Sequence, residues 1–379
     1  MEIDAAEHPE LTFARRLHAA TPRVMVTPAL IALNVIVFIV MLAMGVGIFG
    51  GHADDYLKFG ANFGPLTTGG EWWRLVTCTF VHAGILHLAF NMWALWDSGY
   101  LTERLFGNAW FAAIYLFAGV AGSFASMLWH AETISVGASG AIFGVFGALL
   151  AYTIRQHGSI PPEITNRLRI STSIFVTYSL FYGFAASGID NAAHFGGLAG
   201  GLIMGCIAAR PLEANARAAG HLKRIALALL IAAIALPLAA HFVPDSSRVY
   251  REAMALEKAV KVFADEDRRL AGMYDEVVRR ARDGRLDDRL AASELRNTLL
   301  PAWDRAIAGL SGVEIDAAAP LRKDYELLLR YANARREMSA ALADFLDAAT
   351  PSNRDRFSEK RLEAETALKE YSARQSHKD

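Results

Sequence analysis

The 379-residue sequence has only two cysteines, Cys78 and Cys206, and Cys206 lies within an apolar run. A framework of disulfide bonds is therefore not expected. Basic residues are missing from the start of the chain, where residues 1–14 carry only acidic charges before the first arginine. A cleaved signal peptide begins with basic residues, so we expect the first apolar segment to be kept as a membrane helix.

Charged residues are rare between Val24 and about Val243, whereas long apolar runs are missing after Asp245. The overall values of 53% hydrophobic and 20% charged residues average these two halves. A membrane helix needs roughly 20 mostly apolar residues, which only the first half supplies. The sequence therefore predicts an all-α protein with a polytopic membrane bundle and a soluble helical C-terminal domain. The predicted parts are an N-terminal segment (1–23), a membrane core (24–210), a linker with a seventh span (211–244) and the soluble domain (245–379).

Seven apolar segments are candidates for membrane spans. The second and fourth are short, which is compatible with helices that begin below the membrane surface in a water-filled cavity. The predicted spans are Val26–Phe49, Ile85–Leu101, Ala109–Trp129, Gly140–Ile154, Ile170–Ala186, Ala192–Ala209 and Ile225–Val243.

Arginine and lysine gather on one set of the loops between these spans. That set carries Arg15, Arg16, Arg23, Arg104, Arg155, Arg167, Arg169, Arg210, Arg217, Lys223 and Arg224, and the opposite set only Lys58 and Arg74. The positive-inside rule then predicts a cytoplasmic N-terminus. We expect the membrane to be a bacterial cytoplasmic membrane. Seven spans would place the soluble domain outside the cell. Spans two, four and six would all begin at the outer face.

The C-terminal domain shows helical patterning without a motif for chemistry. Ala253, Leu256, Val260 and Phe263 recur at helical spacing, and Pro301, Pro320 and Pro351 divide the segment. We expect about four helices, packed as a hairpin or small bundle. No nucleotide, metal or nucleophile pattern is present, and no nucleic-acid partner is expected. Binding of a partner protein and self-association both remain open for its amphipathic helices.

A serine and a histidine stand at the starts of the fourth and sixth spans. Ser139 is a weak nucleophile until a base removes its proton, and His194 is a suitable base. Two pairs of glycines, Gly140 with Gly144 and Gly197 with Gly201, have the four-residue spacing that lets helix backbones approach closely. Ser139 and His194 would then form a dyad without an acid. We expect Asp190, one turn before His194, to face solvent at the edge of the loop rather than to complete a triad.

Polar residues at the start of the second span fit the remaining needs of such a site. Attack on a peptide carbonyl creates an oxyanion, which requires hydrogen-bond donors already in place. His87 and Asn91 are four residues apart and share a helix face, and the Ser139 N–H begins another helix. The alternative is a polar patch that only ties the second span to its neighbours. A zinc site of His82, His87 and His194 is disfavoured, because no carboxylate or HExxH motif accompanies them, so no metal or cofactor is expected.

Together these motifs resemble the rhomboid family of intramembrane serine proteases. The resemblance covers residues 71–201 and the first span, and its motifs are highly specific only in combination. They are Trp73-Arg74, His82, His87-x-x-x-Asn91, Glu103-x-x-x-Gly107, Gly137-Ala138-Ser139-Gly140 and Ala193-His194-x-x-Gly197-x-x-x-Gly201.

The resemblance implies a six-helix core with Ser139 as nucleophile, His194 as base, and His87 and Asn91 lining an oxyanion hole. It implies that Arg74 and Glu103 hold the loop after the first span, and it gives His82, Gly137, Gly140 and Gly197 supporting roles. The implied substrates are membrane proteins with a single transmembrane helix, cut near the outer face of the bilayer. No metal or cofactor is implied.

One position departs from the pattern of some bacterial members, which have tyrosine four residues after the serine. Here that residue is Phe143, whose ring can still pack on His194 without a phenol hydrogen bond. Two other readings remain open. One is an inactive relative that binds membrane proteins for quality control or trafficking, and the other is a transporter whose polar helix ends line a pathway.

Overall fold

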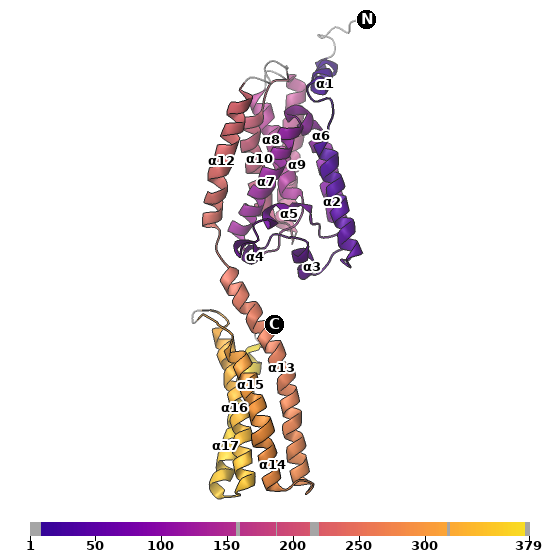
Figure 1. The fold of residues 1–379 in the computed structure, drawn as a ribbon. Helices are drawn as coiled ribbons and strands as arrows, with labels where there is room; N and C mark the ends of the chain where they lie inside the picture. The colour runs from indigo at the N-terminus through magenta and orange to yellow at the C-terminus, as the bar shows by residue number, and fades with distance from the viewer. Residues whose placement is uncertain (1–8, 157–159, 187, 213–219, 317–318, 376–379) are drawn as a thin grey trace. The chain divides into compact units, whose positions relative to one another are not determined.

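The computed structural model describes residues 9–156, 160–186, 188–212, 220–316 and 319–375. Over these residues the chain is helical, apart from loops and one isolated antiparallel bridge between Asn62 and Ser135. It divides into two compact units, Met1–Ser247 and Arg248–Asp379 (Figure 1). Each unit has its own buried apolar core.

The first unit contains the apolar helices. Its helices are α1 (Pro9–Ala20), α2 (Val26–Ala43), α3 (Ala53–Lys58), α4 (Gly64–Thr68), α5 (Arg74–Thr77), the short 3-10 helix η1 (Cys78–Phe80), α6 (Ile85–Phe106), α7 (Asn108–Trp129), α8 (Ser139–Arg155), α9 (Pro162–Ala185), α10 (Asn191–Ala208) and α12 (His221–Phe242). Every predicted span falls on one of these helices.

Four helices in the described part of the chain are long and apolar enough to cross a membrane: α2, α7, α10 and α12. The pair α5–η1 and α6, bent by 96°, would make a fifth span. The chain is therefore an integral membrane protein. Helix α8 is apolar but has only 17 residues, and α9 carries more polar residues, so crossing by these two helices remains a prediction.

The first span ends six residues earlier than predicted. Helix α2 stops at Ala43 instead of Phe49, because Gly45 has φ +97°, a conformation that glycine adopts without strain. The N–H of Gly45 donates to the Leu42 carbonyl and the N–H of Val46 to the Met41 carbonyl, each at 3.0 Å. These two bonds satisfy the last carbonyls of the helix in the Schellman arrangement.

Helix α8 forms the centre of the membrane unit. It contacts α6, α7, α9 and α10, and α10 also packs along α7 (Figure 1). Most side chains of α8, including Ala141, Val145 and Tyr152, are buried. Helix α12 shows the opposite pattern, since Ala228 is its only buried residue. An apolar helix with little buried surface fits a lipid-facing position.

Glu103 is completely buried near the end of α6 and binds the start of α2. Its carboxylate accepts hydrogen bonds from the N–H groups of Met25, Val26 and Thr27 and from the Thr27 hydroxyl, each at 2.7 Å. The first N–H groups of a helix have no partner within the helix, and an anion there is favourable. The expected role of Glu103 in the loop after the first span is therefore wrong, because it holds the opposite end of that span.

Glu103→Gln tests this contact. The glutamine amide keeps the shape of the side chain, but it has no charge and only one acceptor oxygen instead of two. We therefore expect a loss of about 2–3 kcal/mol in stability. The midpoint of denaturation in detergent measures this loss. Asp97→Asn on the exposed side of the same helix is the matched control and should change little. An unchanged midpoint for Glu103→Gln would show that the cap is not needed.

The second unit contains the remaining helices, the first of which begins one residue before it. They are α13 (Ser247–Arg282), α14 (Asp288–Glu294), the π-helical segment Leu295–Leu299, α15 (Leu300–Ser311), α16 (Arg322–Asp347) and α17 (Pro351–Gln375). Buried side chains from α13, α15 and α16, among them Phe263, Leu270, Trp303 and Leu328, form the core. The helical content expected for the C-terminal region is present.

The break expected at Pro301 does not occur. Helix α14 continues through the π-helical segment into α15, and the N–H of Leu300 bonds the Leu295 carbonyl, five residues back. Proline has no N–H to give, so one hydrogen bond of the helix is lost in any case. The π turn just before Pro301 changes the hydrogen-bond pattern at the place where the proline cannot donate, and the helix continues past it.

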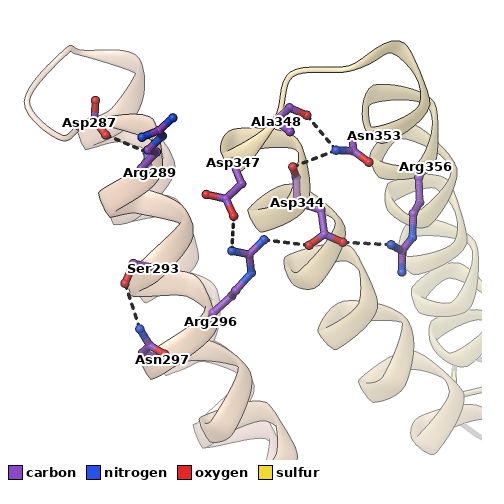
Figure 2. Close-up of polar contacts among 10 residues, drawn as sticks. All are labelled: Asp287, Arg289, Ser293, Arg296, Asn297, Asp344, Asp347, Ala348, Asn353 and Arg356. Atoms are coloured by element: carbon purple, nitrogen blue, oxygen red, sulfur yellow. Dashed lines mark hydrogen bonds and ion pairs between the residues drawn. The ribbon is translucent and has the colours of Figure 1, made fainter.

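Ion pairs join the helices at one end of the second unit (Figure 2). Arg296 of the π-helical segment contacts Asp344 and Asp347 of α16, and Arg356 of α17 contacts Asp344 at 3.0 Å. Asn353 donates to the carbonyls of Asp344 and Ala348. These side chains are partly exposed, so each pair contributes about 0–1 kcal/mol and the apolar core holds the unit together.

Candidate active site

Ser139 and His194 meet at the beginnings of two neighbouring helices. Ser139 is the first residue of α8, and His194 lies in the first turn of α10. The Ser139 Oγ is 2.9 Å from the His194 Nε2, which is hydrogen-bond distance. His194 is buried, whereas Ser139 is half-buried. A hydroxyl and an imidazole at this distance allow the proton of the serine to pass to the ring.

Glycine makes this contact possible, because α8 and α10 touch through their backbones. A Cβ atom added to Gly197 would overlap the Gly140 carbonyl oxygen, and one added to Gly201 would overlap the Gly144 oxygen. A Cβ atom at Gly140 would lie 3.3 Å from the carbonyl oxygen of Ala193, the residue before His194. Small residues permit such close packing between membrane helices.

The Phe143 ring lies flat on the His194 imidazole. Their ring centroids are 4.2 Å apart and their planes differ by 5°. Phe143 is one turn below Ser139 on α8, so the helix that carries the hydroxyl also restricts the ring that faces it. The expected packing of a phenyl group at this position is therefore present.

The Nδ1 atom of His194 is buried and has no hydrogen-bond partner among the residues that the structure describes. Nδ1 must carry the hydrogen of the neutral ring if Nε2 is to accept the Ser139 proton. Asp190 does not bond this atom. The sequence led us to expect that Asp190 faces solvent, but the residue is half-buried. Its carboxylate accepts the N–H of Ala193 at 2.9 Å and the hydroxyl of Ser135 at 2.7 Å.

His87 faces the segment that leads into Ser139. Gly137 has φ +114°, and a Cβ atom there would lie 2.6 Å from the His87 Cε1 and 2.7 Å from its Nε2. Asn91, one turn further along α6, is buried and donates to the His87 carbonyl at 2.9 Å. An amide nitrogen carries two hydrogens, so Asn91 keeps one more to give.

Arg74 contacts the loop after α2 through several hydrogen bonds. Its guanidinium donates to the carbonyls of Leu57 and Ala61 at 2.8 and 2.9 Å, and it pairs with Glu71 at 2.7 Å. It also lies 4.6 Å from the centroid of the Trp73 ring. Five donors in a planar group suit an arginine to join several carbonyls at once.

His82 is fully buried beside His87, with 5.1 Å between their ring centroids. Its Nδ1 lies 3.4 Å from the Phe80 carbonyl. Within the described ranges, no group of three or more histidine, cysteine, aspartate or glutamate side chains lies close enough to hold a metal ion. The His82 ring packs beside His87, and the His87 ring in turn faces Gly137.

Comparison with known proteins matches residues 69–211 to the Rhomboid domain. The Putative rhomboid protease YdcA of Bacillus subtilis is 32% identical over 145 residues, which are 38% of this chain and 71% of the relative. The Rhomboid protease AarA of Providencia stuartii is 31% identical over 195 residues, 46% of this chain and 69% of the relative. The chain belongs to the rhomboid family.

A further rhomboid relative extends the similarity beyond the matched domain. The Rhomboid protease GluP of Bacillus subtilis is 34% identical over 247 residues, which cover 65% of this chain. The chain spans less than half of GluP, 45% of its length.

Two residues beside this rhomboid site, Ser135 and Asn62, are not among those that the sequence predicts for it. Their backbones pair, with Ser135 N–H to Asn62 oxygen at 2.8 Å and Asn62 N–H to Ser135 oxygen at 3.0 Å. The only signal in the sequence is that Ser135 precedes Ser139 by four residues, as Asp190 precedes His194. Pairing between residues 73 positions apart has no local signature.

Gly201→Ala tests the backbone contact between α8 and α10. The added methyl group has no space beside Gly144, so we expect a loss of about 1–3 kcal/mol in stability. Denaturation in detergent, followed by circular dichroism, measures it. Ile203→Ala on the exposed side of α10 is the control and should lose less. A Gly201→Ala protein as stable as the unchanged chain would mean that the two helices are not this close.

Proposed function

We propose that this rhomboid is an intramembrane serine endopeptidase, with Ser139 as nucleophile and His194 as general base. The observation that carries the proposal is the 2.9 Å distance between the Ser139 Oγ and the His194 Nε2. The relatives GluP and AarA bear the name rhomboid protease, which supports the same chemistry. The proposed substrates are membrane proteins with a single transmembrane helix.

The proposed reaction follows acyl transfer in two stages. His194 takes the Ser139 proton while Oγ attacks the peptide carbonyl, and the imidazolium then gives that proton to the leaving amine. Water repeats the sequence with His194 as base and releases the carboxylate. Stacking on Phe143 restricts the imidazole to the plane from which Nε2 meets Oγ, so the ring returns to the same position after each transfer.

Three donors are proposed to stabilise the oxyanion. The Ser139 N–H belongs to the first turn of α8, where N–H groups have no partner within the helix and the helix dipole favours negative charge. The second hydrogen of the Asn91 amide and a ring N–H of His87 are the other two. Gly137 keeps the approach to His87 open, since any side chain there would meet the imidazole.

The site is proposed to open at the outer face of a bacterial cytoplasmic membrane. The charges of the loops support this orientation, because arginine and lysine gather on the opposite side. Both Ser139 and His194 lie in the first turn of their helices, and Ser139 is only half-buried, so water is proposed to enter at these helix ends. Hydrolysis needs this water, since lipid alone would supply none for the second stage.

Ser139→Ala and His194→Ala should each abolish cleavage of a single-span model substrate in liposomes. The first change removes the nucleophile and the second removes its base. Gel analysis of substrate and product measures the rate. Ser171→Ala, at an exposed position on α9, is the control and should cleave normally. Substantial cleavage by either dyad variant would remove the proposed mechanism.

Asn91→Ala should slow cleavage by about 10²–10³-fold in kcat without abolishing it, because other donors remain. KM should change little, since the lost hydrogen bond forms only in the transition state. Initial rates over a range of substrate concentrations in the bilayer separate the two constants. An unchanged kcat would assign Asn91 to packing alone.

A further inference from the structure

We infer that Ser135 and Asp190 form a second bridge between the two segments of the dyad, and that Asp190 is a positioning residue for His194. The inference rests on the proposed function. It concerns a hydrogen bond of 2.7 Å between the Ser135 hydroxyl and the Asp190 carboxylate. The Asp190 carbonyl accepts the His194 N–H at 3.2 Å. The two bridging side chains bond neither the Ser139 hydroxyl nor the His194 ring, so we expect any effect of the bridge on the reaction to act through the positions of Ser139 and His194.

Ser135 is fixed on the nucleophile side. Its backbone exchanges two hydrogen bonds with Asn62, and the Gly137 N–H donates to the Cys78 carbonyl at 2.9 Å. The Asn62 side chain donates in turn to the Ser123 carbonyl of α7 at 3.1 Å. The segment that leads into Ser139 is therefore attached to the loop after α2 and to α7.

Asp190 is fixed on the base side. One carboxylate oxygen accepts the Ala193 N–H at 2.9 Å, which caps the first turn of α10. The other oxygen accepts the Ser135 hydroxyl. A single carboxylate thus holds both the helix that carries His194 and the segment that carries Ser139.

The bridge restricts a movement that the glycine contact leaves open. Gly197 and Gly201 press on α8 at and below the level of Ser139, inside the bundle. The beginnings of α8 and α10 lie at the end of that contact, where helix ends fray most easily. Ser135 and Asp190 each precede their dyad residue by four positions. Their hydrogen bond joins the two segments beyond the dyad. With contacts on both sides, the Oγ to Nε2 distance has little freedom to grow.

Substitutions at these positions separate the bridge from the helix cap. Ser135→Ala removes the hydroxyl, whereas Ser135→Thr keeps it. Asp190→Ser keeps a capping oxygen but has no second acceptor for Ser135, whereas Asp190→Asn keeps two polar atoms in place. Thr133→Ala, at an exposed position in the same loop, is the matched control.

The measurement is the reaction of the full-length protein in liposomes with a fluorophosphonate. The Ser139 Oγ bonds to phosphorus, fluoride leaves, and His194 accepts the proton. The final labelled fraction counts folded, competent sites, and the rate constant reports how well each site is arranged. A merely structural contact would change the first quantity and leave the second as it was.

We expect Ser135→Ala and Asp190→Ser each to lower the rate constant about tenfold with a similar final labelled fraction. The double variant should be no slower than either single one, since both remove the same bridge. Ser135→Thr, Asp190→Asn and Thr133→Ala should react within about twofold of the unchanged chain.

Unchanged rate constants with a smaller labelled fraction would overturn the inference, as would effects that multiply in the double variant. These results leave the proposed function standing if Ser139→Ala takes no label. Failure of the unchanged chain to label at Ser139 would instead overturn the proposed function, and the bridge as a positioning device with it.

Discussion

Backbone contact between α8 and α10 is the constraint on which the membrane unit depends. Gly197 and Gly201 lie against the carbonyl oxygens of Gly140 and Gly144, so neither helix has space for a side chain along this line. Membrane helices gain little from hydrophobic association, and close packing of small residues takes its place. The same contact sets the distance between the first turns of the two helices, and Ser139 and His194 occupy those turns.

Polar side chains in this unit bind helix ends and loops, where backbone groups lack partners. Glu103 caps α2, Asp190 caps α10, and Arg74 binds two carbonyls of the loop after α2. An unsatisfied polar group is costly in a membrane, so each charge is placed where several donors or acceptors converge. Ser139 and His194 therefore lie among helix ends and loops that hydrogen bonds from side chains hold in place.

Much of this arrangement could be predicted from the sequence because its signals are local. Apolar runs located the helices, and the spacing of glycines, Ser139, His194, His87 and Asn91 indicated which helix ends belong together. The errors have physical causes. Gly45 ends α2 early through a left-handed turn, and a π turn lets a helix continue through Pro301.

Contacts between distant residues gave no comparable signal. Glu103 was assigned to the wrong end of the first span because a carboxylate in a helix does not reveal which N–H groups it will meet. Asp190 was expected in solvent, and its partner Ser135 lies 55 positions away. Such pairs depend on how the loops fold back over the helix ends, which composition and periodicity do not determine.

We propose that packing of α8 on α10 turns Ser139 into a nucleophile with His194 as its base. Mass-spectrometric mapping of the full-length protein after reaction with a fluorophosphonate tests it most directly. We expect one adduct, on the peptide that contains Ser139, and its loss when His194 is replaced by alanine. An adduct on a different serine, or an undiminished Ser139 adduct without His194, would contradict it.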